Sequence, residues 1–249
     1  MPSFTKAQLY ARLKGIFDSF IRTLHPKGYA CLFCGDELTE KDREESICDK
    51  CKAKLPYRIE QTCPVCGNYY SREGLCPKCR KALPSFKKAY APFDFSGNIR
   101  KMIIGYKDGG KPFLGEYIAR YLAIFAKAME IEADYLAFVP SHPKTIRRRG
   151  FDHNLKVAKI LSAELNIPLI EPLERVKLNK DQTKLSTEER LTNVNKVFAE
   201  RKDFDFNVIK EKTILLIDDV MTTGATCSSC SNILKRLGAD KILILTLAR

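Results

Sequence analysis

Apolar residues recur along the chain at helical spacing in three segments. Residues 4–24 carry apolar side chains on one face and basic side chains elsewhere on the circumference, which predicts an amphipathic helix. Residues 113–129 and 154–165 show the same spacing and are expected to be helices. We expect the first helix to pack on the body of the protein, and the alternative is a position on a membrane surface.

Short continuous apolar runs alternate with helical segments through the second half of the chain, which is typical of buried parallel strands. Alternation at this spacing predicts an α/β fold, in which helices cover a parallel sheet. The charged and polar stretches between these elements are expected to be loops or lids. The expected strands are residues 86–95, 135–139, 168–170, 214–217 and 242–247; a helix is expected at 225–237, and loops at 107–111, 177–190 and 200–212.

Composition narrows the class of protein. The chain has 249 residues, of which 45% are hydrophobic and 29% charged, as in an ordinary globular protein. No apolar run reaches the roughly 18 residues of a membrane span, and no signal peptide is visible, so we expect a cytoplasmic protein. The net charge of +13 favours a polyanionic partner such as nucleic acid, and a solvated lysine-rich surface is the alternative.

Eight of the ten cysteines form four C-x-x-C pairs. Disulfides are unfavourable in the reducing cytoplasm, whereas paired thiolates from tight turns are typical zinc ligands. Four pairs provide ligands for two structural zinc ions, each with four cysteines and no open position. The spacing alone leaves sequential and interleaved pairing open. The predicted ligands are Cys31, Cys34, Cys48, Cys51, Cys63, Cys66, Cys76 and Cys79.

A strand, two acids and a threonine-rich turn follow one another from Ile214 to Thr226. The carboxyl end of a buried strand is where open α/β sheets bind ligands, and carboxylates there can accept hydrogen bonds from ribose hydroxyls. The following helix N-terminus offers backbone N–H groups to a phosphate. The pattern differs from a dinucleotide fingerprint and from a Walker loop. The residues predicted to bind phosphoribosyl pyrophosphate (PRPP) are Asp218, Asp219, Val220, Met221, Thr222, Thr223, Gly224, Ala225 and Thr226.

This segment resembles the phosphoribosyltransferase signature, and two others narrow the resemblance to the ComF family of phosphoribosyltransferase-like proteins. Residues 139–154, which read VPSHPKTIRRRGFDHN, resemble the VPxxxxRxxxRGFNQ segment of that family. Gln182 to Ser186, together with Arg190, Asn193 and Phe198, resembles a second family segment. The paired cysteines also fit. The chain departs from the family pattern where Asp152-His153 replaces Asn-Gln and where Thr145 replaces an arginine.

The resemblance implies a type I phosphoribosyltransferase fold with an N-terminal zinc ribbon. It also implies that the pyrophosphate of PRPP, with Mg²⁺, lies on the loop after the strand at 135–139. Catalysis would then rest on positioning and on charge stabilisation, and no side chain is assigned as catalytic. The predicted pyrophosphate loop comprises Ser141, His142, Lys144, Arg148, Arg149 and Gly150.

Three parts of the chain are therefore expected: a helix at 1–27, a zinc module at 28–85 and a phosphoribosyltransferase-like domain at 86–249. The resemblance implies a PRPP-binding protein that acts in the uptake or processing of single-stranded DNA during natural transformation, with other DNA-uptake proteins as partners. The alternative function is an active phosphoribosyltransferase of nucleotide metabolism with an unknown acceptor. A third reading is a zinc-ribbon adaptor that docks onto another protein, for instance a helicase.

Overall fold

The computed structural model describes residues 29–43, 46–58, 60–176 and 197–249. These residues belong to two compact units, 1–55 and 56–249, and each unit is described by itself. The expected helix at 4–24 and the expected loop at 177–190 lie outside the described residues. The expected boundaries at 27/28 and 85/86 remain predictions, and the division at 55/56 falls between the two predicted zinc sites.

Unit 1 is described from residue 29 and contains two short helices, α2 (Glu40–Arg43) and α3 (Asp49–Lys52). Leu38 and Ile47 are buried. A bridge between Ala30 and Glu37 closes the turn that carries the first two cysteines. Because so few apolar side chains are available in such a short segment, a bound metal is the expected source of its stability.

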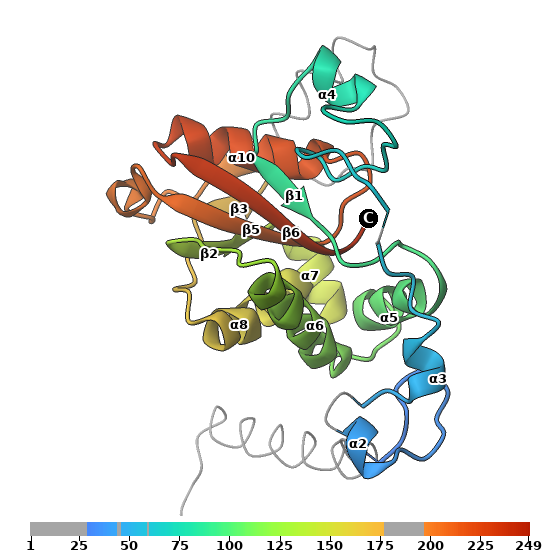
Figure 1. Cartoon of the computed structure of the whole chain (residues 1–249). Helices are drawn as coiled ribbons and strands as arrows, with labels where there is room; N and C mark the ends of the chain where they lie inside the picture. The colour runs from blue at the N-terminus through green and yellow to red at the C-terminus, as the bar shows by residue number, and fades with distance from the viewer. Residues whose placement is uncertain (1–28, 44–45, 59, 177–196) are drawn as a thin grey trace, which may run out of the picture. The chain divides into compact units, whose positions relative to one another are not determined.

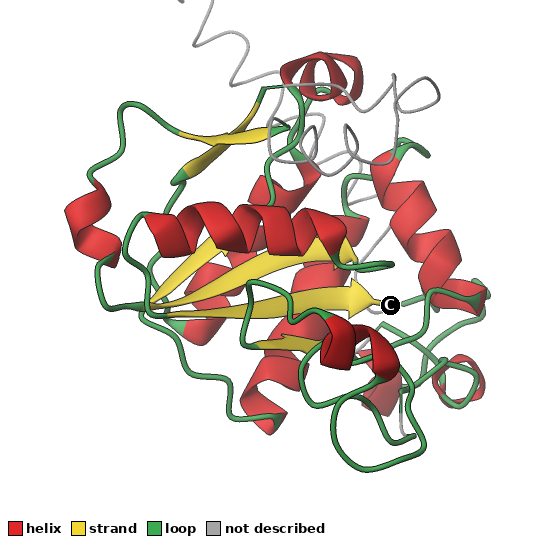
Figure 2. Ribbon diagram, turned by 90° about the horizontal axis from the view of Figure 1, so that it is seen from above, coloured by secondary structure: helices red, strands yellow, loops and turns green. Residues whose placement is uncertain are grey.

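Unit 2 contains a four-stranded parallel sheet in the order β1-β6-β5-β2 (Figure 2). Leu136 bridges Leu169 in parallel, which adds the expected short piece at 168–170 to the edge beside β2. The core strand β5 is buried along Ile214–Ile217 because helices cover both sheet faces. The strands are β1 (Lys88–Tyr90), β2 (Tyr135–Phe138), β5 (Thr213–Val220) and β6 (Lys241–Ala248).

Helix α10 covers one face of this sheet, and α5, α6 and α8 lie on the other (Figure 1). This placement follows from the right-handed crossovers that join parallel strands. Gly115 in α6 allows a close contact with α5, since a Cβ there would lie 2.8 Å from the Tyr106 ring. The helices are α4 (Pro77–Lys81), α5 (Gly97–Lys107), α6 (Leu114–Ala128), α8 (His153–Leu165) and α10 (Ala225–Arg236).

The predicted α/β class is confirmed, and the predicted elements need three corrections. The strand expected over 86–95 is only the three residues of β1. The loop expected at 200–212 begins in a strand and contains the 3-10 helix η2 (Phe206–Ile209). An unexpected antiparallel hairpin pairs β3 (Leu173–Arg175) with β4 (Phe198–Glu200). These elements are too short for hydrophobic periodicity to reveal them.

Candidate functional site

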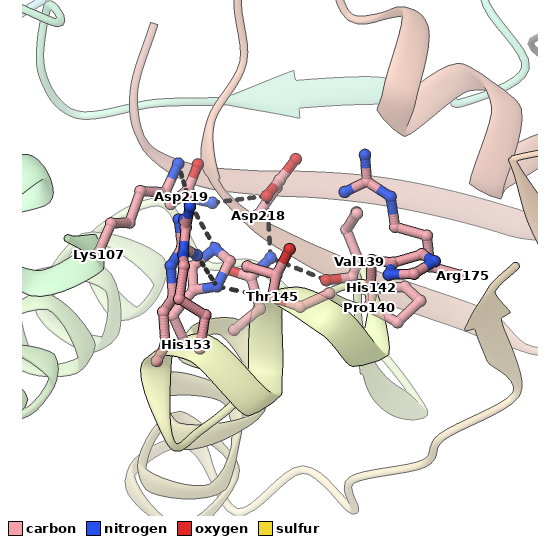
Figure 3. A pocket seen from close by; sticks show the side chains of 13 residues that line it. Lys107, Val139, Pro140, His142, Thr145, His153, Arg175, Asp218 and Asp219 are labelled. Carbon is pink, nitrogen blue, oxygen red and sulfur yellow. Dashed lines mark hydrogen bonds and ion pairs between the residues drawn. The ribbon is translucent and has the colours of Figure 1, made fainter. Parts of the chain in front are cut away.

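Two carboxylates lie at the carboxyl end of β5, inside a cavity of about 280 Å³ (Figure 3). Strand β5 is parallel to its neighbours, so its end opens at the edge where α/β sheets bind ligands. Asp219 is buried, and its Oδ2 atom lies 2.7 Å from Nε2 of His153. Lys107, at the end of α5, forms an ion pair with the same oxygen. Asp219 is therefore held in place by two partners before any ligand arrives.

The first turn of α8 positions these acids. Asp152 is its N-cap and accepts hydrogen bonds from the backbone N–H groups of Asn154 and Leu155. The Asn154 amide donates to Oδ1 of Asp218 at 2.9 Å and to the carbonyl of Val139 at 2.8 Å, which links α8 to β5 and β2. Asp152 and His153, the two residues that depart from the family pattern, are thus themselves part of the site.

The hydrogen bonds of His153 indicate its tautomer. An Arg149 guanidinium nitrogen lies 3.2 Å from Nδ1 of His153, and a guanidinium can only donate. This contact favours Nδ1 as an acceptor and a proton on Nε2, which would then donate to Asp219. The Ser141 hydroxyl lies 3.0 Å from the same Nδ1 and is held by Asp152. This chain of contacts joins the basic segment after β2 to the acid pair.

The two carboxylates ionise differently. Burial and the negative charge of Asp219 raise the pKa of Asp218 to about 6. Burial also acts against ionisation of Asp219, but the hydrogen bond from His153 and the ammonium of Lys107 outweigh it and lower its pKa. At neutral pH both groups can accept hydrogen bonds from ligand hydroxyls, and Asp218 is the more readily protonated.

The predicted pyrophosphate loop needs a correction, because most of it is the helix α7 (Pro143–Arg149). His142 is the N-cap, and Gly150 ends the helix with a φ of 83°. A proline at the first position of a helix and a glycine after its last residue are a usual combination, and Pro143 and Gly150 of this segment form it. Helix α7 comes shortly after β2, and its residues Thr145, Arg148 and Arg149 line the cavity that contains the acid pair.

The structure brings four of the six predicted loop residues into the cavity and leaves two outside its lining. Lys144 and Gly150 are exposed and do not line it. Arg148 and Arg149 both contact Oδ1 of Asp108, at 3.2 and 3.1 Å. This pairing joins α7 to the turn after α5. The four residues in the lining are Ser141, His142, Arg148 and Arg149.

The threonine-rich turn lies after the acids and before α10, as predicted. Gly224 is the N-cap of α10 with a φ of 76°, a conformation that favours glycine. Thr222, Thr223 and Thr226 are exposed, and none of them lines the cavity around the acids. Met221 is buried and donates its backbone N–H to the carbonyl of Ala248. The turn therefore presents an exposed helix N-terminus directly after the acids that line the cavity.

The eight predicted zinc ligands form two groups in sequence order, which resolves the open pairing. In each group the sulfur atoms all lie within 4.8 Å of one another. The Cys34–Cys48 and Cys66–Cys76 Sγ distances are both 3.7 Å. A tetrahedral zinc with bonds of about 2.3 Å requires sulfur atoms about 3.8 Å apart. The thiols thus fit two structural four-cysteine zinc sites.

The two clusters share a detail of ligand chemistry. The backbone N–H of Cys48 faces the Cys31 sulfur at 3.4 Å, and that of Cys76 faces the Cys63 sulfur at 3.5 Å. Burial opposes ionisation of these thiols, but backbone N–H donors outweigh it and lower the pKa of Cys31 and Cys63 to about 6. Each cluster therefore contains one thiol that readily becomes the thiolate zinc requires.

Sequence reasoning missed three side chains around the site. Arg175 of β3 lines the cavity, and no motif pointed to it. Asp108 pairs with the α7 arginines although it lies in a turn. Lys78, between two zinc ligands, donates to the carbonyl of Thr223 at 2.6 Å. The one sequence signal for Lys78 is its position between two zinc ligands in C-P-K-C, because a turn fixed by a bound metal also orients the residues between the ligands.

Family and sequence comparisons identify relatives over most of the chain. A model described as a double zinc ribbon domain matches residues 20–80. Competence protein F of Haemophilus influenzae is 26% identical over 89% of this chain and 97% of its own length. Competence protein ComFC of Streptococcus pneumoniae is 24% identical, covering 88% of this chain and 99% of its own. The DNA utilization protein YhgH of Escherichia coli is also 24% identical, covering 82% and 90%.

Solved structures that align with the chain include phosphoribosyltransferases. Glutamine PRPP amidotransferase of B. subtilis aligns with 53% of this chain and 26% of its own at a TM-score of 0.38 and 16% identity. Adenine phosphoribosyltransferase of Leishmania tarentolae aligns with 54% and 56% at a TM-score of 0.35 and 17% identity. Scores this low carry no structural detail.

Among the described residues, no helix is both long and apolar enough to cross a bilayer. The acidic strand end, the glycine-capped turn and the two cysteine clusters occupy the positions that the sequence motifs require. The named relatives extend over more than four fifths of the chain. The resemblance to the ComF family of phosphoribosyltransferase-like proteins, with an N-terminal double zinc ribbon, is thereby confirmed.

Proposed function

We propose that the chain binds PRPP, or another ligand with a 5-phosphoribosyl group, at the carboxyl end of β5. The observation that carries this proposal is the acid pair Asp218 and Asp219, which is followed directly by the glycine-capped turn before α10. Carboxylates that can accept hydrogen bonds from ribose hydroxyls are thus followed directly by a helix N-terminus that can bind a phosphate, as a ribose 5-phosphate requires.

The parts of the ligand have separate partners in this proposal. The ribose hydroxyls donate to Asp218 and Asp219. The 5-phosphate accepts from backbone N–H groups of residues 222–226 and from threonine hydroxyls there. The pyrophosphate lies against Ser141 and the arginines of α7, which line the same cavity. Guanidinium groups suit phosphate oxygens because they donate two parallel hydrogen bonds.

Mg²⁺ fits this donor set, because it usually binds through one or two carboxylates together with ligand phosphates. When bound, it would reduce the negative charge of the pyrophosphate. The chain itself restrains the site. Lys107 and His153 already contact Asp219, so a ribose hydroxyl must share that carboxylate or displace the ammonium. Lys107 is the mobile partner of the two, since its side chain is longer and less buried.

Calorimetric titration with PRPP and Mg²⁺ tests the proposal. The parent should bind, and the double variant Asp218→Asn/Asp219→Asn should bind at least tenfold more weakly, because two charge-assisted acceptors are lost (about 1.5–3 kcal/mol each). Equal binding by both proteins would refute the site assignment. An assay of PRPP consumption with candidate acceptors then separates a transferase from a protein that only binds the ligand.

We further propose that this binding serves the handling of single-stranded DNA. The named relatives are competence and DNA utilization proteins. The net charge of +13 favours a polyanion. In unit 2, the Tyr69 ring is partly exposed, and the guanidinium of Arg58, which is buried and paired with Asp94, lies 4.0 Å from its centroid. Exposed aromatic rings can stack bases without reading sequence.

Fluorescence anisotropy with a labelled single-stranded oligonucleotide tests the DNA role. Binding should be measurable at low salt and should weaken steeply as salt is raised, because counterions are released from the phosphates. Tyr69→Ala should weaken binding, whereas Tyr117→Ala provides a comparison outside this surface. An absence of binding at low salt would remove the DNA role and leave the PRPP proposal untouched.

A further inference from the structure

One cation that lines the cavity has no acidic partner among the described residues. Lys107 pairs with Asp219, and the two α7 arginines pair with Asp108. Arg175 lines the same cavity, yet no carboxylate lies within ion-pair distance of it among the residues that the structure describes. A partly buried guanidinium without a counter-charge is unfavourable, which suggests that an anion completes it.

The position of Arg175 is defined by its hairpin. It is the last residue of β3 and pairs in register with Phe198 of β4. Its guanidinium carbon lies 5.4 Å from the centroid of the Phe198 ring, a cation–π contact that holds the head group. Its Nε atom is buried and has no hydrogen-bond partner in the described parts of the chain. An unpaired buried donor costs free energy that a ligand could recover.

Arg175 points toward the segment that follows β2, where Figure 3 shows it beside His142. Burial and then the charge of Arg175 lower the pKa of His142, so the two groups are electrostatically close. Thr145 also lines this end of the cavity. In the family pattern an arginine stands at that position, so α7 lacks one of the expected positive charges.

We propose that Arg175 binds the pyrophosphate group of the phosphoribosyl ligand and supplies, from β3, the positive charge that Thr145 does not. This inference rests on the proposed PRPP binding and adds to it a residue from a different part of the fold. Guanidinium donors from β3 and α7 would then contact the pyrophosphate from two sides. Arg175 is thus assigned as a ligand-binding residue with no step in chemistry.

The test compares Arg175→Met with Arg201→Met by titration with PRPP and Mg²⁺ and with ribose 5-phosphate. Arg201 follows β4, pairs with Glu171 and Asp203, and does not line the cavity. Both variants lose one positive charge from the same hairpin region. Arg175→Met should weaken PRPP binding about tenfold, the effect of one charge-assisted contact, and leave ribose 5-phosphate binding unchanged. Arg201→Met should bind both ligands as the parent does.

Two results would overturn the inference while leaving the proposed function intact: equal PRPP binding by the two variants, or an equal loss for PRPP and ribose 5-phosphate in Arg175→Met. Failure of the parent to bind PRPP would instead refute the proposed function, and this inference with it. Thermal unfolding checks that both variants fold. If Arg175→Met unfolds early, Arg175→Lys replaces it and should still bind PRPP more weakly than the parent, because it loses the guanidinium fork.

Discussion

The two cysteine clusters have the same ligand geometry and very different surroundings. In the first cluster Cys34 is exposed and Cys48 is half-buried, and all four ligands belong to unit 1. In the second cluster all four cysteines are buried, within the hydrophobic core that also contains β5 and β6 residues. The first zinc site therefore organises a small segment, whereas the second is part of the core of the sheet.

Specific contacts connect the second cluster to the sheet and to the ligand turn. The carbonyl of Val65, between two zinc ligands, accepts a hydrogen bond from the N–H of Ala89 in β1 at 2.8 Å. Lys78 reaches the carbonyl of Thr223 in the threonine-rich turn. Two clusters with the same ligand motif therefore stabilise different amounts of structure, because a zinc site stabilises only the residues that pack against it.

The largest expected difference follows from the matched variants Cys66→Ser and Cys34→Ser. Each should reduce the zinc content from two ions to one. Cys66→Ser should also destabilise the sheet unit by several kcal/mol, because a structural zinc contributes on the order of 10 kcal/mol to folding. Cys34→Ser should leave unfolding of that unit unchanged. Zinc analysis combined with urea unfolding measures both, and an equal loss of stability in the two variants would remove the distinction.

A smaller effect is expected from Asp218→Asn, confined to the sheet unit. Burial raises the pKa of Asp218 to about 6, so the folded state keeps this proton longer than the unfolded chain does. Its contribution to stability therefore falls as the pH rises from about 4 to about 6 and stays unfavourable above that window. The variant keeps an acceptor for Asn154 and should be more stable than the parent by roughly 1–3 kcal/mol at pH 7.5.

The gain in Asp218→Asn should decrease to about half at pH 5, where the parent carboxyl is mostly protonated in the fold. Urea unfolding at the two pH values measures it. A gain that does not depend on pH would show that the ionisation of Asp218 is not its source. Unfolding of unit 1 should not respond at either pH.

The two cysteine clusters can also be compared at the glycine that follows the first C-x-x-C pair of each. Gly35 and Gly67 each follow a C-x-x-C pair and have φ values of 81° and 67°. A Cβ at Gly35 would meet nothing within 4 Å, whereas one at Gly67 would lie 3.0 Å from the carbonyl oxygen of Ala89. Gly35→Ala should cost about 1 kcal/mol from backbone strain alone, and Gly67→Ala about 1 kcal/mol more. Equal costs in thermal unfolding would mean that the contact with β1 is unimportant.

The smallest predicted effect concerns Lys78. Replacing it with methionine removes one contact that steadies the threonine-rich turn, worth about 0.5–1 kcal/mol. PRPP affinity should then fall roughly three- to fivefold. Lys81→Met removes the same charge from the same short helix, and in the described structure Lys81 makes no hydrogen bond to that turn, so this variant should have no effect. Titration calorimetry distinguishes the two variants, and an equal decrease would point to long-range charge alone.

The sequence predicted those parts of the fold whose signal is local and repeated. The apolar runs at 135–139 and 214–217 identified β2 and β5 because both faces of these strands are buried. The acids at the end of β5 were found because strand, acids and turn are consecutive. Four of the six residues predicted to bind the pyrophosphate line the same cavity as the acids, although much of that segment is helical.

What the sequence could not reveal depends on contacts between distant segments. His153 looked like a loss of a family amide, and only its distance to Asp219 shows that it holds the acid pair. Arg175 belongs to a three-residue strand with no periodicity to mark it. Lys107 stands at the start of a segment predicted to be a loop, and its pairing with Asp219 is visible only in the structure. Such pairings depend on tertiary packing, which cannot be predicted from residue propensity or from spacing along the chain.

The strand end at Asp218–Asp219 and the turn at 222–226 are proposed to form a phosphoribosyl site that the second cysteine cluster supports and that does not depend on the first. Hydrogen–deuterium exchange with and without PRPP and Mg²⁺ tests this proposal in one measurement. We expect slower exchange in residues 218–228 and 140–154, a smaller change in 76–81, and none in 29–55. Unchanged exchange at 218–228, or protection centred on 29–55, would contradict it.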